Sequence, residues 1–377
     1  MKQMNIFRIV FFLILGATLL PRQNATAADV SITSTPQTSP QHKPNIKIIA
    51  TGGTIAGVGS SAIKSSYEPG KIAIGSLLDA VPQVNDIANV TGEQLVNIGS
   101  EHMTDQVMLS LAKRINQFMD DNQTDGIVIT HGTDTMEESA FFLSLTTKGT
   151  KPVILVGAMR PSTAMSADGP LNLYNAIVAA SAPESAGKGV LVAMNGSLYP
   201  AEDVLKTHTI NVEAFQAPNK GPEGYINNGK VCYYNKTDNS PISHIGNPEQ
   251  ALSFDISGLS SLPKVGIIYG HSNIDPDIIE TMIQNGYKGI IYAGVGNGNI
   301  HKNVMPALDK ARREGIVVVR SSRVPQGPTI TEPDIYEGPH QLIASQYLNP
   351  QKSRILLMLS LTHTKNHTEI QRYFDKY

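Results

Sequence analysis

Residues 45–54 read Asn-Ile-Lys-Ile-Ile-Ala-Thr-Gly-Gly-Thr, a short β-branched run that stops at a pair of glycines. Similar runs recur along the chain, and longer segments with the apolar spacing of helices separate them. The runs are Ile46–Ala50, Gly126–Thr130, Pro152–Val156, Gly189–Met194, Val265–Tyr269, Gly289–Ala293 and Ile316–Arg320. This alternation predicts an α/β fold in which helices cover mostly parallel sheets.

The helical segments place their apolar residues on one side. In Thr104–Met119, for example, Val107, Leu111, Ile115 and Phe118 share a face. We expect this segment to be a helix that faces the core.

The strand–helix pattern is interrupted once. Residues 237–263 are rich in Pro, Ser and Asn, and a second strand–helix series begins at Lys264. We therefore expect two α/β domains, each around a mostly parallel sheet. The larger N-terminal domain spans 44–236, a linker spans 237–263, and the smaller C-terminal domain spans 264–377.

The N-terminus has the pattern of an export signal. Lys2 and Arg8 precede the apolar run Ile9–Leu20, and Ala25-Thr26-Ala27 follows it. A membrane anchor is the alternative, but the run is shorter than the roughly 20 apolar residues of a spanning helix. We expect a cleaved signal peptide at 1–27, a flexible leader at 28–43, and no membrane attachment after cleavage.

Composition narrows the class of partner. The 377 residues are 41% hydrophobic and 16% charged, with a net charge of -2 and no basic run, so nucleic acid is not an expected partner. The ten histidines are scattered without a His-Glu-x-x-His motif, so no metal site is predicted. Cys232 is the only cysteine, which excludes an internal disulfide and makes association into an oligomer a plausible source of stability.

Glycine, hydroxyl and amide groups gather where predicted strands end. Ligands of open α/β sheets bind at the carboxyl ends of strands, so these turns are candidate sites. The turns are Thr51-Gly52-Gly53-Thr54, His131-Gly132-Thr133-Asp134-Thr135, Gly157-Ala158-Met159-Arg160 and Gly294-Val295-Gly296-Asn297-Gly298-Asn299. Glycines let the backbone approach a ligand, and the threonines beside them are candidate nucleophiles.

Two residues of the second turn have a simpler interpretation. Thr135 with Glu138 fits a capping box, so Thr135 is expected to cap a helix and not to take part in catalysis. Asp134 can be either a carboxylate at the start of that helix or a functional group.

Several motifs together resemble the bacterial L-asparaginases, in particular their secreted, periplasmic type II branch. Two of them look like the two signatures of that family: Ile48-Ile49-Ala50-Thr51-Gly52-Gly53-Thr54-Ile55-Ala56 and Val128-Ile129-Thr130-His131-Gly132-Thr133-Asp134-Thr135. The similarity extends from about Asn45 to Tyr377. It includes Gly157-Ala158-Met159-Arg160-Pro161, Ser166-Ala167-Asp168-Gly169-Pro170, Gly296-Asn297-Gly298-Asn299 and Asn349-Pro350-Gln351-Lys352.

The resemblance implies catalytic roles for five residues. Thr54 is the implied nucleophile, and the hydroxyl of Tyr67 lies close to it on a mobile loop that folds over the substrate. Thr133, Asp134 and Lys206 are the implied second catalytic set. A base must take the proton of a threonine hydroxyl before it attacks, and the residues leave that base open between Lys206 and Tyr67.

The resemblance also implies how substrate is held. Ser100 and Glu101 are the substrate-holding pair, and an Asn at the position of Asn299 comes from a neighbouring subunit. The working unit is then a close dimer, usually paired into a tetramer, and no metal or organic cofactor is needed. Backbone N–H groups near Thr133 and Ala158 are plausible donors to an oxyanion.

The implied reaction is hydrolysis of L-asparagine to L-aspartate and ammonia through an acyl-enzyme in the periplasm. Glu101 leaves a mixed glutaminase-asparaginase open, because relatives with Glu at this position have appreciable glutaminase activity. An acidic residue that the family places after Ser-Ser-Arg-Val-Pro can be Glu332 or Asp334. A periplasmic amino-acid-binding protein is the non-enzyme alternative, since it also combines export, two α/β lobes and a polar cleft.

Overall fold

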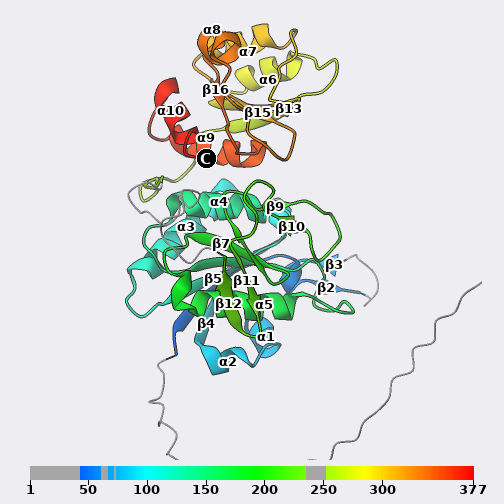
Figure 1. Cartoon of the computed structure of the whole chain (residues 1–377), viewed down its shortest axis with the longest axis vertical. Helices are drawn as coiled ribbons and strands as arrows, with labels where there is room; N and C mark the ends of the chain where they lie inside the picture. The colour runs from blue at the N-terminus through cyan, green and yellow to red at the C-terminus, as the bar shows by residue number, and fades with distance from the viewer. Residues whose placement is uncertain (1–42, 61–66, 72–73, 235–251) are drawn as a thin grey trace, which may run out of the picture. The chain divides into compact units, whose positions relative to one another are not determined.

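The computed structural model describes residues 43–60, 67–71, 74–234 and 252–377 (Figure 1). The expected signal peptide at 1–27, residues 28–42 of the expected leader and residues 237–251 of the expected linker lie outside the described residues. From Lys43 onward, an eight-stranded sheet with its helices forms an N-terminal lobe. A four-stranded sheet with its helices forms a smaller C-terminal lobe, so the predicted fold class is confirmed.

The N-terminal sheet has the order β12-β11-β8-β7-β6-β5-β1-β4. Its strands are β1 (Asn45–Gly52), β4 (Asn89–Ile98), β5 (Gly126–Thr130), β6 (Val153–Val156), β7 (Val190–Met194), β8 (Ser197–Pro200), β11 (Gly224–Asn227) and β12 (Lys230–Tyr233). The five strands from β7 to β4 are parallel, and the other three are antiparallel. Because neighbouring parallel strands end at one edge, the turns after β6, β5, β1 and β4 lie side by side.

Alternate side chains of the central strands enter two different cores. Ile49 and Ile129 pack with helices α3 (Asp105–Asp120) and α4 (Met136–Thr146). Ile48 and Val128 pack with helix α5 (Gly169–Ser181). The period of two follows from the strand geometry, so the sheet is covered by helices on both faces.

The C-terminal lobe repeats this arrangement on a smaller scale. Its parallel strands are β13 (Val265–Tyr269), β14 (Gly289–Gly294), β15 (Val317–Ser322) and β16 (Ile343–Ala344). Helices α6 (Asp277–Gln284) and α7 (Met305–Arg313) share one core with this sheet. Helix α9 (Pro350–Ser360) belongs instead to the core that contains α3 and α4, so one apolar core joins the two lobes.

The remaining elements are short or peripheral. They are η1 (Thr54–Ala56), β2 (Val58–Gly59), β3 (Tyr67–Glu68), α1 (Ile74–Asp79), α2 (Val84–Ile87), η2 (Ser100–His102), η3 (Pro183–Ser185), β9 (Leu205–Lys206), β10 (Phe215–Gln216), η4 (Pro333–Glu337), α8 (Gly338–His340) and α10 (His367–Phe374). No helix among the described residues has both the length and the apolar character needed to cross a membrane.

All seven predicted strands are present, as is the predicted helix, which α3 forms with Thr104 as its N-cap. Strand β4 was not predicted, because most of its side chains are polar or partly exposed at the sheet edge and give no apolar run. The described part of the expected linker, 252–263, contains no helix or strand, yet Phe254 and Ile256 are buried in the shared core.

Candidate active site

The turn after β1 brings two distant motifs into backbone contact. Gly53 has φ 80°, a conformation that favours glycine, and a Cβ atom at this position would collide with the backbone of Gly132. Its N–H donates to the carbonyl of Ile98 at the end of β4 (2.9 Å). Thr54 follows directly, opens η1 and is only 5% exposed. The turn that contains Thr54 therefore packs directly against the turn that contains Thr133.

His131 supports the turn after β5 from inside the protein. Its Nδ1 lies 2.6 Å from the carbonyl of Gly132, and its Nε2 lies 2.8 Å from Oγ of Ser139. Burial lowers the pKa of His131 to about 4, so the ring is neutral near pH 7. A neutral ring donates through one nitrogen and accepts through the other, which suits these two partners.

Ser100 and Glu101 follow β4 and lie beside the second motif. The N–H of Asp134 donates to Oγ of Ser100 (3.1 Å), and the hydroxyl of Thr135 donates to the carbonyl of Ser100 (2.8 Å). Thr135 does stand at the N-cap position of α4, but the predicted capping box is wrong because its hydroxyl bonds across to Ser100 instead. Glu101 is exposed, and its carboxylate lies 3.6 Å from Nε2 of His102.

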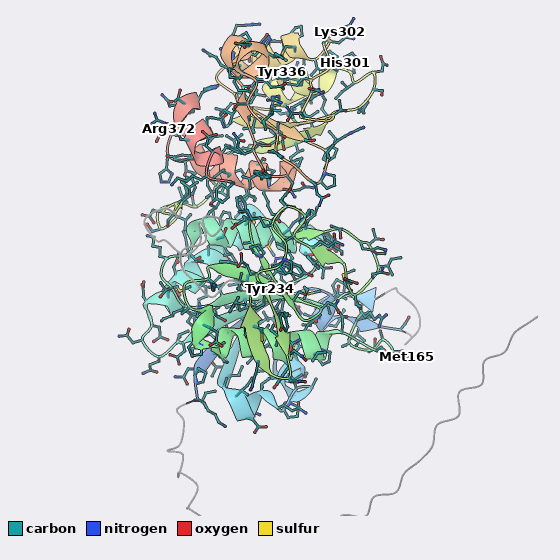
Figure 2. All side chains as sticks on the ribbon, viewed as in Figure 1. Met165, Tyr234, His301, Lys302, Tyr336 and Arg372 are labelled. Carbon is teal, nitrogen blue, oxygen red and sulfur yellow. The ribbon has the colours of Figure 1, made fainter. Side chains whose placement is uncertain are left out.

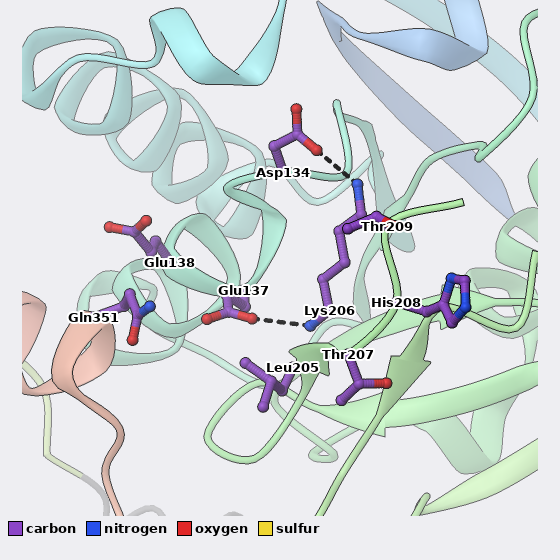
Figure 3. A pocket seen from close by; sticks show the side chains of 9 residues that line it. All are labelled: Asp134, Glu137, Glu138, Leu205, Lys206, Thr207, His208, Thr209 and Gln351. Atoms are coloured by element: carbon purple, nitrogen blue, oxygen red, sulfur yellow. Dashed lines mark hydrogen bonds and ion pairs between the residues drawn. The ribbon is translucent and has the colours of Figure 1, made fainter. Parts of the chain in front are cut away.

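Lys206 joins Thr133 and Asp134 from β9. Its ammonium donates to Oγ1 of Thr133 (2.8 Å) and to Oδ1 of Asp134 (2.6 Å). Its backbone N–H donates to Oε2 of Glu137 (3.0 Å). Figure 3 shows Lys206, Asp134 and Glu137 at a cavity of about 350 Å³. Asp134, Glu137, Glu138, Leu205, Lys206, Thr207, His208, Thr209 and Gln351 line the cavity.

This cavity is not the whole candidate site. Its lining includes Asp134 and Lys206 but neither Thr54 nor Ser100. We therefore define the site by the four adjacent turns, with the cavity next to the Lys206 end.

The turn after β6 is the fourth of the adjacent turns at this edge of the sheet. Ala158 is fully buried, and both carboxylate oxygens of Asp168 accept the N–H groups that follow it, those of Met159 and Arg160 (2.9 Å each). Asn172 donates to the same carboxylate (3.0 Å). The Asp168 carboxylate therefore holds in place the backbone that follows Ala158.

Tyr67 lies in a segment that is tied to the first turn. Its backbone belongs to β3, which pairs with β2, and the N–H of Gly70 donates to the carbonyl of Gly53 (3.2 Å). Residues 61–66 and the side chain of Tyr67 lie outside the described part of the chain, so the expected approach of its hydroxyl to Thr54 stays a prediction.

Asn299 lies in the other lobe, in the turn after β14. It exchanges two backbone hydrogen bonds with Val295 (2.8 and 3.2 Å), and its side chain is exposed. Thus three of the four predicted turns, with Ser100 and Glu101, meet at the edge of one sheet, whereas the fourth belongs to a separate sheet.

A buried arginine organises the segment near Asn299. Arg320 is fully buried, donates to the carbonyl of Asn297 (2.5 Å), and lies 4.5 Å from the ring centre of Tyr336, labelled in Figure 2. Its guanidinium is also 3.4 Å from Oε2 of Glu332. Asp334 lies in the first turn of η4 and is exposed. Of the two candidate acids, Glu332 is therefore engaged by Arg320.

Within the described residues, no group of three or more His, Cys, Asp or Glu side chains is arranged to hold a metal ion.

Family models match both lobes of the chain. Residues 45–239 match the model described as "Asparaginase, N-terminal", and residues 264–374 match "Glutaminase/Asparaginase C-terminal domain". The chain belongs to the asparaginase family. The resemblance in its motifs is thereby confirmed.

Curated relatives of this asparaginase cover nearly its whole length. L-asparaginase 2 of Escherichia coli is 52% identical over 334 residues, which are 89% of this chain and 93% of the relative. The "Probable L-asparaginase periplasmic" of Haemophilus influenzae is 52% identical over 336 residues, with the same coverage. The glutaminase-asparaginase of Pseudomonas fluorescens is 44% identical over 338 residues, or 88% of this chain and 90% of the relative.

A solved structure agrees with the fold. The crystal structure of the "Probable Cytoplasmic L-asparaginase" from Campylobacter jejuni superposes with a TM-score of 0.84 at 47% identity. The match covers 89% of this chain and 100% of that one.

Sequence reasoning missed two carboxylates that support the site of this asparaginase. Asp168 fixes the amides after Ala158, and Glu137 fixes the strand that carries Lys206. Asp168 stands in a motif quoted for the family, and Glu137 comes two residues after another. The sequence alone does not reveal which backbone N–H groups these two carboxylates accept.

Proposed function

We propose that Thr54 is the nucleophile of this asparaginase and that Thr133, Asp134 and Lys206 form its second catalytic group. The chain is an L-asparaginase, which hydrolyses L-asparagine to L-aspartate and ammonia. One observation supports the residue assignment above all. The buried Thr54 follows Gly53, whose backbone touches Gly132, and Gly132 immediately precedes Thr133.

The proposed reaction has two halves. The hydroxyl oxygen of Thr54 attacks the side-chain carbonyl carbon of asparagine, and its proton either passes to Lys206 in its neutral amine form or is relayed through the hydroxyl of Tyr67. Backbone amides near Thr133 and Ala158 receive the oxyanion. The C–N bond then breaks, the protonated leaving group departs as ammonia, and an ester on Thr54 remains. Water hydrolyses this ester, releasing aspartate and regenerating the hydroxyl.

We propose that the substrate's charged ends are held by the neighbouring turns. Asp134 and Glu101 pair with the α-ammonium, and Ser100 holds the α-carboxylate. The oxygen of Ser100 accepts the N–H of Asp134, and the hydroxyl still carries a proton to donate.

The decisive experiment compares ammonia release by the wild-type enzyme and by Thr54→Val. Valine keeps the shape of threonine and removes the hydroxyl, so we expect a loss of at least about 10³-fold in kcat. Thr51→Val is the matched control, because Thr51 donates to the carbonyl of Thr130 inside the sheet (2.8 Å) and has no assigned catalytic role. Substantial turnover by Thr54→Val would remove Thr54 from the mechanism.

We further propose that active sites are shared between subunits of a homotetramer built from close dimers, with Asn299 reaching the partner's site. The exposed position of Asn299 on the C-terminal lobe supports this. Mixing Thr54→Val subunits with Asn299→Ala subunits tests it. A mixed dimer then contains one site with both defects and one native site, so activity should return on mixing. Lack of recovery in verified mixed oligomers would place Asn299 outside the partner's site.

We propose that the enzyme is exported to the periplasm. The charged start, apolar run and Ala25-Thr26-Ala27 pattern support this, as does the name of the Haemophilus relative. Expression in a Gram-negative host should yield periplasmic enzyme that begins at Ala28. Enzyme that stays in the cytoplasm with Met1 attached would contradict export.

We also propose that residues 44–236 and 264–377 form the two domains, with residues 237–263 as the linker between them.

Glutamine is a second candidate substrate. The Pseudomonas relative is named a glutaminase-asparaginase, and Glu101 stands at the position where the two activities are expected to diverge. Ammonia release from both amides, measured side by side, gives the ratio directly. One methylene in a pocket contributes only about 1–3 kcal/mol to such selectivity.

A further inference from the structure

Lys206 is carried by a hairpin that the main sheet does not hold. Strand β9 is only two residues long, and among the described residues its ladder pairing is with β10 alone. So short a pair cannot by itself fix the strand. Other contacts must therefore fix the backbone from which the Lys206 side chain extends.

Glu137 supplies one of these contacts. Its carboxylate is buried, with the residue 6% exposed, and each oxygen accepts one hydrogen bond. Oε2 accepts the backbone N–H of Lys206 (3.0 Å), and Oε1 accepts Nδ2 of Asn349 (3.2 Å). In Figure 3 the carboxylate of Glu137 points at the backbone of Lys206, while the Lys206 ammonium points at Asp134.

Both ends of the lysine are thus held by one stretch of chain. Thr133 and Asp134 precede α4 and take the ammonium, while Glu137 in the first turn of α4 takes the backbone N–H. A lysine side chain has four rotatable bonds, so the position of its ammonium depends on where its backbone is anchored. Misplacement of a catalytic group by 1 Å can cost about 10²-fold in rate.

Helix α9 of the C-terminal lobe secures the other side. Asn349 is the N-cap of α9, and the ammonium of Lys352 donates to the carbonyl of Val204, two residues before Lys206 (2.5 Å). Lys352 is 2% exposed. Burial lowers its pKa, and the carboxylates of Glu137 and Asp203 act in the opposite direction. The first turn of α9 therefore contacts the residue just before β9 directly through Lys352, and Asn349 reaches the backbone of Lys206 indirectly through Glu137.

We propose that Glu137 is a positioning residue for Lys206, and that Asn349 and Lys352 couple the position of Lys206 to the C-terminal lobe. The inference rests on the proposed catalytic role of Lys206. Glu137 itself does not touch the reacting atoms. It acts by holding the lysine backbone at the place from which the ammonium reaches Thr133.

Glu137→Gln is the central variant. Glutamine keeps the length of the side chain but presents an NH₂ group to one of the two donors, so one hydrogen bond is lost. We expect kcat for asparagine to fall about 10- to 100-fold with KM changed less than about threefold. Glu184→Gln is the control. Glu184 is exposed and does not line the cavity, so kcat should stay within about twofold of wild type.

A second variant separates this role from helix capping. Asn349 also accepts the N–H of Lys352 (2.9 Å), as an N-cap does. Asn349→Ser retains an acceptor for the cap and removes the Nδ2 donor to Glu137. We expect an unchanged thermal midpoint and a kcat about 3- to 10-fold lower. Full activity in this variant would overturn the proposed coupling to α9.

Repeating Glu137→Gln in a Lys206→Met background distinguishes positioning from general stabilisation. If Glu137 acts through Lys206, the substitution lowers kcat in the wild-type chain but adds no loss once the ammonium is absent. An equal fold-loss of kcat in both backgrounds would overturn the inference. It would also be overturned if Glu137→Gln is fully active while Lys206→Met is inactive. Normal activity of Lys206→Met by itself would instead refute the proposed role of Lys206.

Discussion

The ammonium of Lys206 lies 2.6 Å from Oδ1 of Asp134, although the two residues are 72 positions apart in the chain. The lysine is largely enclosed, whereas the Asp134 side chain is 59% exposed. One carboxylate can therefore face the proposed catalytic lysine on one side and a substrate ammonium on the other.

Removing the Lys206 ammonium should slow the chemical step. We expect Lys206→Met to lower kcat for asparagine at least about 100-fold with a small change in KM, because proton transfer by a positioned group contributes about 10²–10⁴-fold. Lys148→Met is a suitable control, since Lys148 pairs at the surface with Asp255 (3.5 Å). Steady-state ammonia release measures both variants, and a twofold effect in Lys206→Met would exclude the lysine as an essential group.

Neutralising Asp134 should weaken substrate binding. In Asp134→Asn the α-ammonium of asparagine loses a charged partner, and a hydrogen bond to a charged group is worth about 1.5–3 kcal/mol. We expect KM to rise about 10- to 100-fold, together with a lower kcat because Lys206 loses the same partner. Isothermal titration with aspartate gives an independent measure of binding. Unchanged KM and aspartate affinity would contradict the proposed ammonium contact.

Glu101 should influence the choice between asparagine and glutamine. We expect Glu101→Gln to lower the ratio of kcat/KM for glutamine to that for asparagine by up to about tenfold, within the 1–3 kcal/mol that such pocket contacts provide. The exposed Glu184 offers a control substitution to Gln that should leave the ratio unchanged. An unchanged ratio in Glu101→Gln would show that Glu101 does not determine selectivity between the two amides.

His131 should make stability depend on pH. Burial lowers its pKa from 6.5 to about 4, so the unfolded chain binds more protons between these values. The free energy of unfolding should be highest above pH 6.5 and should fall as pH drops toward 4. The contribution of this group is on the order of 3 kcal/mol.

Urea unfolding across pH 4–8 tests this expectation. His131→Gln should show a smaller pH slope, whereas a Gln substitution of the exposed His271 should retain the wild-type slope. Identical slopes in His131→Gln and the wild type would show that His131 does not titrate in this way.

The close contact between the backbones of Gly53 and Gly132 should leave no room for a side chain at position 53. Gly53→Ala adds a Cβ that meets the backbone of Gly132 and also strains a φ of 80°. We expect a loss of about 3 kcal/mol in unfolding free energy and loss of activity. Gly187 has a similar φ of 74° with open space around it, so Gly187→Ala reports the backbone strain alone. Equal stability of the two variants would contradict the steric argument.

Much of the fold could be predicted from the sequence because its central strands are buried on both faces. Runs such as Gly126–Thr130 are therefore continuously buried and nearly all apolar. Strand β4 has no such run, and without that strand nothing in the residue pattern indicated that Ser100 and Glu101 stand beside the first two turns. The assignment of Ser100 and Glu101 to the site therefore depended on the family resemblance.

Contacts between backbone and distant side chains were harder to foresee. The motif around Thr133 predicted a functional turn, but the bond from Thr135 to Ser100 depends on where the unpredicted strand β4 ends, and its register with β1 shifts between Ala50 and Gly52. Glu137, Asn349 and Lys352 are polar residues whose burial is decided by how the two lobes pack. A local pattern cannot specify that packing.

The bond between Glu137 and Asn349 has a consequence for the timing of synthesis. The two residues are 212 positions apart, so at about 5–20 residues per second a ribosome makes Asn349 roughly 10–40 s after Glu137. Once Lys206 has been made, the nascent chain contains Thr54, Thr133 and Lys206 but still lacks helix α9. The strand that carries Lys206 gains its full support only afterwards, so a growing polypeptide reaches full hydrolytic activity only once residues 349–360 have been made and packed.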